Sequence, residues 1–140
     1  PLHGVFMSKT YKGGCLCKSV TFEIHGDVTG VSYCHCSICR KASGAGAGAV
    51  LLAAPEHLVW TAGEQLTKTY VLESGWSRTF CPNCGSAVPQ NHADEPLCFV
   101  PAGSLDDDPG PVVMGHIYVG SKMSWDHIGD ESPQYNENYT

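Results

Sequence analysis

The stretch that decides the fold is Cys81-Pro82-Asn83-Cys84-Gly85, in which two residues separate a pair of cysteines. Such a spacer folds both thiols toward one point. Pro82 fixes its own φ angle, and Gly85 permits the left-handed backbone that this kind of turn favours. The pattern is typical of a zinc knuckle. One knuckle supplies two of the four ligands of a structural zinc site, so a second close pair of cysteines is expected elsewhere in the chain.

Cys15-Leu16-Cys17 is the best partner for this knuckle. In an extended segment, residues i and i+2 point to the same side, so both thiols would face one metal ion. Gly13-Gly14 directly before the pair gives the backbone freedom to approach that ion. The alternative for each pair taken alone is a core or reactive dithiol. Together the two pairs predict a closed, four-coordinate structural zinc site made of Cys15, Cys17, Cys81 and Cys84.

A further cluster, Cys34-His35-Cys36-Ser37-Ile38-Cys39, places three thiols within six residues. Cys34 and Cys36 share one face of an extended segment, and Cys39 returns from the first turn of a short helix. We predict this helix over 37–43, with Ser37 as its N-cap. Three protein ligands without an evident fourth are typical of a catalytic zinc with an open position. The cluster therefore predicts a second zinc site, which makes two zinc ions per chain.

The fourth position of the second site has several candidate occupants. Water, a substrate thiolate or a carbonyl oxygen would occupy it in a catalytic site. Cys98, or a distant histidine such as His92 or His116, would instead close it and make it structural. Cys98 lies in an apolar run, where a buried thiol is the simpler interpretation. His35 points away from the sulfurs by strand alternation, which favours a packed or surface histidine over a ligand.

Arg40 and Lys41 directly follow the third cysteine of this cluster. The ordinary interpretation of such residues is solvated surface charge. The functional interpretation is a cationic rim, because three thiolates on one Zn²⁺ leave a net charge of −1. Nearby cations would offset that charge and attract an anionic substrate. On this argument Arg40 and Lys41 are predicted substrate-binding residues.

The composition is that of a globular protein with reduced cysteines. The chain has 140 residues, of which 42% are hydrophobic and 16% charged, and this length predicts one domain. The eight cysteines could form disulfides or metal sites, and their close pairs favour metal and a reducing cytoplasm. The net charge of −6 argues against a nucleic-acid partner. No apolar run is long enough to cross a membrane, and no secretory signal is recognised.

The chain is predicted to form many short strands, separated by glycine and proline, with little helix. We interpret residues 1–9 as an N-terminal leader, native or added for expression, because Met7 is a candidate start. Residues 10–140 are then one zinc-binding domain. The predicted strands are Ser19–His25, Val28–Tyr33, Val50–Ala53, Leu58–Thr61, Lys68–Leu72, Leu97–Pro101 and Val113–Val119.

Two stretches of biased composition have local interpretations. Gly44–Ala49 (GAGAGA) is predicted to be a strand of minimal side chains. It would either let another segment pack closely against its backbone or form the floor of a cavity beside a metal. Asp106-Asp107-Asp108 precedes Pro109-Gly110, which favours a solvated turn. A calcium loop would need alternating oxygen ligands and a distal glutamate, and this pattern is absent.

The three cysteine motifs, taken in this order, resemble the glutathione-dependent formaldehyde-activating enzyme family, to which centromere protein V is related. The resemblance covers the chain from about Thr10 to Tyr135. The stretches that carry it are Gly13–Cys17, Cys34–Lys41 and Phe80–Ser86, followed by Ala102–Asp106, His116–Val119 and Lys122–Trp125.

This resemblance implies a mainly β fold, described for the family as a zinc-stabilised β-tent of twisted antiparallel sheets with short helical turns. It implies a structural zinc at the first four cysteines and an exchangeable ligand on the second zinc. The implied function is that of a zinc-dependent carbon–sulfur lyase-type enzyme, acting on a thiol–aldehyde adduct such as S-hydroxymethylglutathione. Glutathione is then the small-thiol partner. The sequence itself identifies no general acid or base and leaves the catalytic residues unknown, with His35 and His116 only as candidates.

The alternative function is a non-catalytic, zinc-structured binding module with two closed sites. The coordination at Cys34, Cys36 and Cys39 separates the two functions. An enzyme needs three protein ligands and an exogenous group there, whereas a binding module needs four protein ligands.

Overall fold

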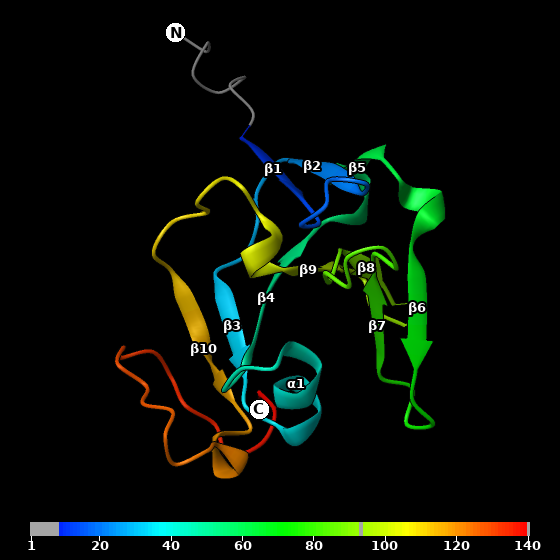
Figure 1. The fold of residues 1–140 in the computed structure, drawn as a ribbon. Coiled ribbons are helices and arrows are strands. Elements are labelled where there is room, and N and C mark those ends of the chain that lie inside the picture. The colour runs from blue at the N-terminus through cyan, green and yellow to red at the C-terminus, as the bar shows by residue number, and fades with distance from the viewer. Residues whose placement is uncertain (1–8, 93, 140) are drawn as a thin grey trace, which may run out of the picture.

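The computed structural model describes residues 9–92 and 94–139, so the predicted leader over 1–9 lies, apart from Lys9, outside the described residues. Short strands and one α-helix, α1 (Ser37–Ser43), make up the regular structure of this part of the chain (Figure 1). The strands are β1 (Thr10–Gly14), β2 (Thr21–His25), β3 (Val31–Cys34), β4 (Gly48–Ala53), β5 (Leu58–Ala62), β6 (Lys68–Val71), β7 (Ser77–Phe80), β8 (Gln90–Asn91), β9 (Cys98–Pro101) and β10 (Val113–Ile117). Short 3₁₀ turns are η2 (Pro55–His57), η3 (Glu64–Leu66), η4 (Ala102–Ser104) and η5 (Val119–Ser121). Within the described residues, no helix has the length and apolar character needed to cross a membrane.

The strands form three sheets. One is antiparallel in the order β1-β2-β5, the largest has the order β10-β3-β4-β9-β8, and the third is the β6-β7 hairpin. In the largest sheet β3 pairs antiparallel with β4 but parallel with β10. The predicted mainly β fold is confirmed, whereas its description as wholly antiparallel needs this correction. The parallel pair arises because β10 comes from far along the chain, without the hairpin that joins adjacent antiparallel strands.

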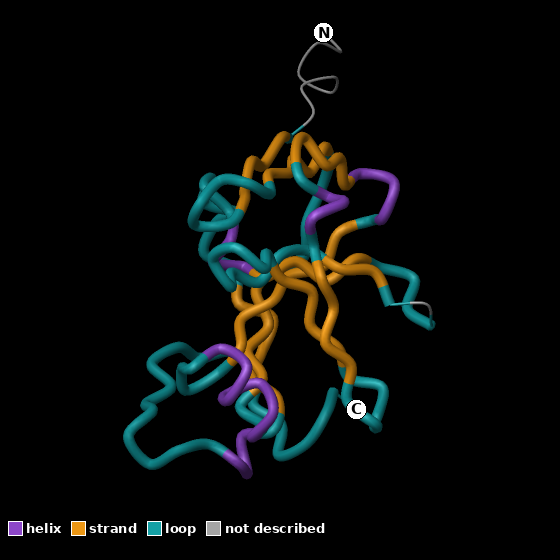
Figure 2. Tube along the Cα trace, turned by 45° about the vertical axis from the view of Figure 1, so that its right-hand side comes forward, coloured by secondary structure: helices purple, strands orange, loops and turns teal. Residues whose placement is uncertain are grey.

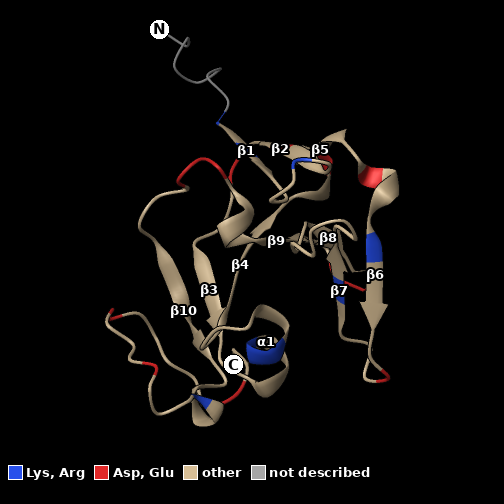
Figure 3. Cartoon of the chain, in the orientation of Figure 1, with Lys and Arg blue, Asp and Glu red and all other residues tan. Residues whose placement is uncertain are grey.

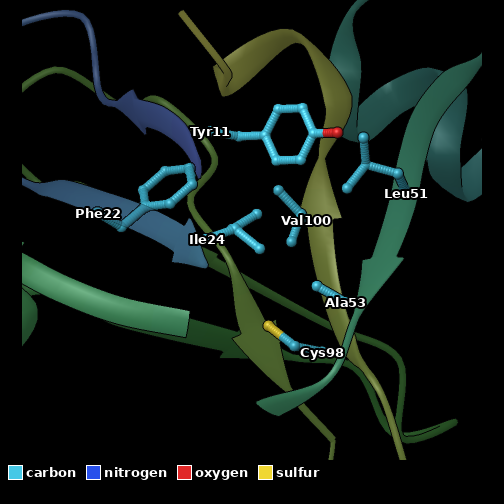
Figure 4. Packing of buried hydrophobic residues seen from close by; sticks show 7 residues of the cluster. All are labelled: Tyr11, Phe22, Ile24, Leu51, Ala53, Cys98 and Val100. Carbon is cyan, nitrogen blue, oxygen red and sulfur yellow. The ribbon is translucent and has the colours of Figure 1, made fainter. Parts of the chain in front are cut away.

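The main core lies between the three-stranded and five-stranded sheets (Figure 4). In β2 the residues alternate between buried and less buried positions, which sends Phe22 and Ile24 inward. Cys98 of β9 is fully buried in this core and packs as an apolar thiol, as its apolar surroundings in the sequence predicted. The buried members of the core are Tyr11, Phe22, Ile24, Leu51, Ala53, Cys98 and Val100.

Figures 1 and 2 show the three-stranded sheet at one end of the molecule and α1 near the other. Strands β3 and β4 run between these ends and lead into and out of the α1 segment. The chain end after η5, residues 122–139, returns beside β10 and is called the strap. Its backbone is hydrogen-bonded to β10 through His116 N to Pro133 O and Tyr135 N to His116 O, both at 2.9 Å.

Strand β7 is attached to the largest sheet by the side chain of Gln90. The amide oxygen of Gln90 accepts a hydrogen bond from Thr79 N at 2.5 Å, and its nitrogen donates to Ser77 O at 3.2 Å. Gln90 therefore adds to the backbone pairing on this edge of β7, where Val88 N donates to Thr79 O at 3.0 Å. Because β6 pairs with the other edge, β7 is held on both sides, and so is Arg78 at its centre.

Two local predictions around α1 are wrong. The N-cap is Cys36 and not Ser37, because the Cys36 thiol accepts the hydrogen bond from Cys39 N at 3.4 Å and Ser37 is already helical. Gly44–Ala49 is not a continuous strand, because Gly44 ends α1 with a left-handed φ of 69° and the next residues bend before β4 begins at Gly48.

The described contacts favour the close-packing interpretation of this glycine-rich stretch. A Cβ atom at Gly46 would lie 2.6 Å from an Asp126 carboxylate oxygen, and one at Gly48 would lie 3.3 Å from the Cys39 Cβ. A cavity of about 880 Å³ adjoins Cys15 instead, and its lining comes from other segments, including Lys18. The stretch is therefore small so that the strap and α1 can approach it.

Candidate metal centres

The four cysteines of the predicted first site come together, with their sulfurs all within 4.8 Å of one another. The sulfur of Cys17 lies 3.7 Å from that of Cys15 and 3.8 Å from that of Cys81. Sulfurs at about 2.3 Å from a tetrahedral zinc are about 3.8 Å apart, whereas a disulfide needs about 2.05 Å. All eight cysteines are free thiols. The spacing and the sulfur donors therefore fit a zinc ion.

Tight turns present the two pairs of this first group. Cys81 begins the predicted knuckle, with Gly85 N donating to Cys81 O at 2.7 Å and Gly85 at a φ of 79°. Cys15 and Cys17 lie in a turn closed by Lys18 N to Cys15 O at 3.1 Å, so the extended segment predicted there is wrong. The turn arises because Lys18 adopts a left-handed φ of 67°. It nevertheless brings both sulfurs to one side.

Hydroxyl groups favour thiolates in the first group. The Ser19 hydroxyl is the main reason that the pKa of Cys17 falls to about 7. The Ser86 hydroxyl lies 3.3 Å from the Cys84 sulfur and is the main reason that the pKa of Cys84 falls to about 5. A thiolate is the form of cysteine that binds metal. The ionised form is thus favoured at Cys17 and Cys84, whereas the pKa of Cys81 rises to about 11, because burial and hydrogen bonds with Cys15 and Cys84 outweigh the backbone hydrogen bonds that lower it.

The three cysteines of the predicted second site also come together, with sulfurs within 4.8 Å of one another. Cys34 ends β3, Cys36 caps α1, and Cys39 lies in the first turn of that helix. All three are half-buried. Across residues 9–92 and 94–139 this group has three members and no fourth cysteine, histidine or carboxylate.

The candidate fourth ligands of the second site lie elsewhere. Cys98 is in the main core. His92 lies 2.9 Å from the Gln90 amide, and His116 is bonded to His35 and Asp130. His35 is almost fully buried and is not a member of the cysteine group, in line with its interpretation as a packed histidine.

Charge within the second group is unevenly shared. A hydrogen bond from the Cys39 thiol is the main reason that the pKa of Cys34 falls to about 6. The same contact raises the pKa of Cys39 well above its usual range. Burial lowers the pKa of the Arg78 guanidinium, and the charge of Cys39 opposes this shift. Arg78 on β7 is therefore within electrostatic range of Cys39.

The predicted rim residues are placed differently from Arg78. Lys41 is exposed on α1, and the Arg40 Nε is buried without a hydrogen-bond partner in the described part of the chain. Figure 3 shows basic residues on α1 and β7, with acidic residues along the strap. Nothing in the sequence singled out Arg78. The available signal was its position three residues before Cys81 in a short, partly polar segment.

Next to the second group, two buried histidines and two carboxylates of the strap form a continuous series of contacts. His35 Nε2 lies 2.9 Å from His116 Nδ1, and His116 Nε2 lies 2.9 Å from Asp130 Oδ2. His35 Nδ1 lies 3.2 Å from Asp126 Oδ2, at an angle that departs from a straight hydrogen bond. The His116 ring also stacks on Tyr33, with centroids 4.9 Å apart. Sequence reasoning identified neither carboxylate.

Comparisons with known proteins agree with this geometry. The model of the family described as "Glutathione-dependent formaldehyde-activating enzyme" matches residues 10–121. A curated protein of Halomonas elongata, named "Putative glutathione-dependent formaldehyde-activating enzyme", is 31% identical over 128 residues, which cover 84% of this chain and 80% of that protein. A crystal structure of a Rhodobacter sphaeroides protein has a similar fold, with a TM-score of 0.57 and 22% identity, covering 73% of this chain and 97% of that one. The family match spans well over half of the chain and carries both cysteine groups. The chain therefore belongs to the glutathione-dependent formaldehyde-activating enzyme family.

Proposed function

We propose that this chain is a zinc-dependent carbon–sulfur lyase-type enzyme that makes or breaks a thiol–aldehyde adduct resembling S-hydroxymethylglutathione. The observation that carries the proposal is the second cysteine group. It has three sulfur donors and no fourth protein donor in the described residues, in a chain of this family. An open position of this kind is typical of catalytic zinc.

In the direction of synthesis, the sulfur of glutathione attacks the carbonyl carbon of formaldehyde. The C–S bond forms, the π pair of the C=O bond moves to oxygen, and the thiol proton ends on that oxygen. Lyase action is the reverse, so no oxidant or reductant is needed.

The two cysteine groups have different proposed roles. Cys15, Cys17, Cys81 and Cys84 hold a structural zinc. Cys34, Cys36 and Cys39 hold the second zinc, which lowers the pKa of a coordinating thiol or polarises an aldehyde oxygen when it is bound. The free thiols of the chain support a reducing compartment, the cytoplasm, as its location.

The chain's own cations select the thiol in this proposal. Three thiolates and one zinc carry a net charge of −1, so an anionic thiol approaches against repulsion. Arg78 is half-buried and lies within electrostatic range of Cys39. Its guanidinium has no hydrogen bond or ion pair in the described part of the chain. Such a guanidinium is free to donate paired hydrogen bonds to a carboxylate of glutathione. Arg40 and Lys41 remain proposed rim residues that add longer-range attraction.

Exchange spectroscopy of formaldehyde with glutathione tests the proposal. The zinc-loaded protein should accelerate exchange between free glutathione and the adduct. The matched control is Cys36→Ser, which removes one sulfur from the second group and leaves the first group intact. Exchange at the uncatalysed rate with the parent protein would exclude this activity. Four protein ligands on the second zinc would instead favour the non-catalytic binding module.

A further inference from the structure

The strap, residues 122–139, is connected to the loop of the second cysteine group by two buried histidines and two partly exposed carboxylates. Asp126 faces the His35 ring, His35 bonds to His116, and His116 bonds to Asp130, at the distances given above. The two histidine side chains are only 2% and 5% exposed. Both carboxylates come from the strap, which follows the matched family span of 10–121.

Contacts within the strap hold the backbone of Asp126 and the carboxylate of Asp130. Lys122 Nζ donates to Asp126 O at 2.6 Å, and Ser132 N donates to Asp130 Oδ1 at 2.9 Å. The Ser132 hydroxyl and then His116 hold the pKa of Asp130 at about 2, so this carboxyl is ionised. Buried polar side chains are costly without partners. Asp130 therefore satisfies the outer nitrogen of His116, whereas Asp126 lies 3.2 Å from His35 Nδ1 without completing a hydrogen bond and acts on that ring through its charge.

His35 connects this chain of contacts to the thiols. It stands between Cys34 and Cys36, and its backbone nitrogen donates to Ile117 O at 2.9 Å. Its ring is held at one nitrogen by His116 and approached at the other by Asp126. Asp126 also packs against Gly46, in the segment after α1. The segment that carries all three sulfurs is thus held at three points: the backbone of His35, the ring of His35, and Gly46 after α1.

We propose that Asp126, His35, His116 and Asp130 are positioning residues, through which the strap holds the three-thiol loop in the geometry that binds metal. The inference rests on the metal site of the proposed function but not on its reaction. Loss of the strap contacts should weaken metal binding at the second group, while the first group, whose cysteines lie between β1 and β2 and between β7 and β8, keeps its metal. Outer contacts of this kind change metal affinity by about 10–100-fold when removed.

The test measures zinc affinity at each group by competition with a chromophoric chelator, and follows cobalt-substituted protein by its ligand-field bands. Asp126→Ala should lower second-group affinity at least tenfold and shift the cobalt bands, whereas Asp126→Asn, which keeps an acceptor oxygen, should recover most of the loss. Glu131→Ala, an exposed neighbour on the strap, is the matched control.

A glycine pair tests the same inference without altering any charge. Gly46→Ala places a Cβ 2.6 Å from the Asp126 carboxylate and should displace it, giving the same selective loss. Gly129→Ala meets nothing within 4 Å and should bind both metals as the parent does.

Unchanged second-group affinity in Asp126→Ala and Gly46→Ala would overturn the inference. Equal losses from both groups, together with a lower melting temperature, would also overturn it, because they indicate a general structural role. If the parent protein fails to catalyse adduct exchange while the variants still lose second-group affinity selectively, the proposed reaction fails and the positioning role stands.

Discussion

Replacing Cys84 with serine should destabilise the whole domain, whereas the same change at Cys36 should not. Cys84 belongs to the first cysteine group, of which Cys15, Cys81 and Cys84 share a small core with Val20, Val88 and the partly buried Trp60. Cys36 belongs to the half-buried second group at the start of α1. Both substitutions replace a cysteine sulfur with a serine oxygen. A difference between the two variants therefore reports the position of the cysteine and not the nature of the replacement.

The size of the effect follows from how little apolar material surrounds the first group. Burial of two valine side chains contributes about 3–6 kcal/mol. Zinc binding to a four-ligand structural site contributes about 10–16 kcal/mol, comparable with the whole stability of a domain. Losing even about 5 kcal/mol of it should lower the melting temperature by about 15 °C, at roughly 3 °C per kcal/mol for a chain of this length.

Thermal unfolding and metal analysis of the two purified variants check this reasoning. Cys36→Ser should stay folded, with about one zinc per chain, and melt within a few degrees of the parent. Cys84→Ser should unfold or melt far below it. A Cys84→Ser protein that melts like the parent would refute the structural assignment of the first group.

Three further outcomes are expected. Limited chelation of protein carrying about two zinc ions should remove the second-group metal first, because that group offers three sulfurs, and simultaneous loss would contradict an open site. Arg78→Gln should weaken binding of glutathione more than Lys41→Gln does, without changing the affinity for the uncharged thiol mercaptoethanol; equal losses for both thiols would argue against carboxylate recognition. Burial raises the pKa of Cys98 to about 11 from 9.0, so only the unfolded thiol ionises between these values. The parent should therefore lose stability relative to Cys98→Ala as pH rises from 9 to 11, by up to about 1.4 kcal/mol per pH unit in urea unfolding, and a constant difference would contradict this burial effect.

Elements with a clear local pattern could be predicted from the sequence. Ser19–His25 alternates, and β2 occupies its end. The α1 helix has the predicted bounds. β1 was missed because its second inward position is Gly13, where a Cβ would lie 2.5 Å from the Phe22 ring. The absent side chain that lets Phe22 pack there also removes the apolar signal that would have marked a strand.

The surroundings of the second group could not be predicted in the same way. Short spacing brings Cys34, Cys36 and Cys39 together, because three thiols within six residues need only one local turn. Asp126 and Arg78 reach that place from distant elements, and no periodicity links either residue to the cysteines. Their roles depend on tertiary contacts, namely the return of the strap beside β10 and the attachment of β7 through Gln90.

The different environments of the two cysteine groups suit the structural role proposed for the first group and the catalytic role proposed for the second. In the first group Cys15 and Cys81 are buried, and serine hydroxyls lower the pKa of Cys17 and Cys84. A metal ion enclosed by these four sulfurs would therefore be part of the core. In the second group all cysteines are half-buried, and the loop that carries them is held by the contacts that connect His35 with the strap. A metal site whose ligands are held by contacts on one side can leave its other side open to an exogenous ligand without losing its geometry. This arrangement is what an exchangeable fourth position requires, since the fixed ligands must keep their places while the fourth comes and goes.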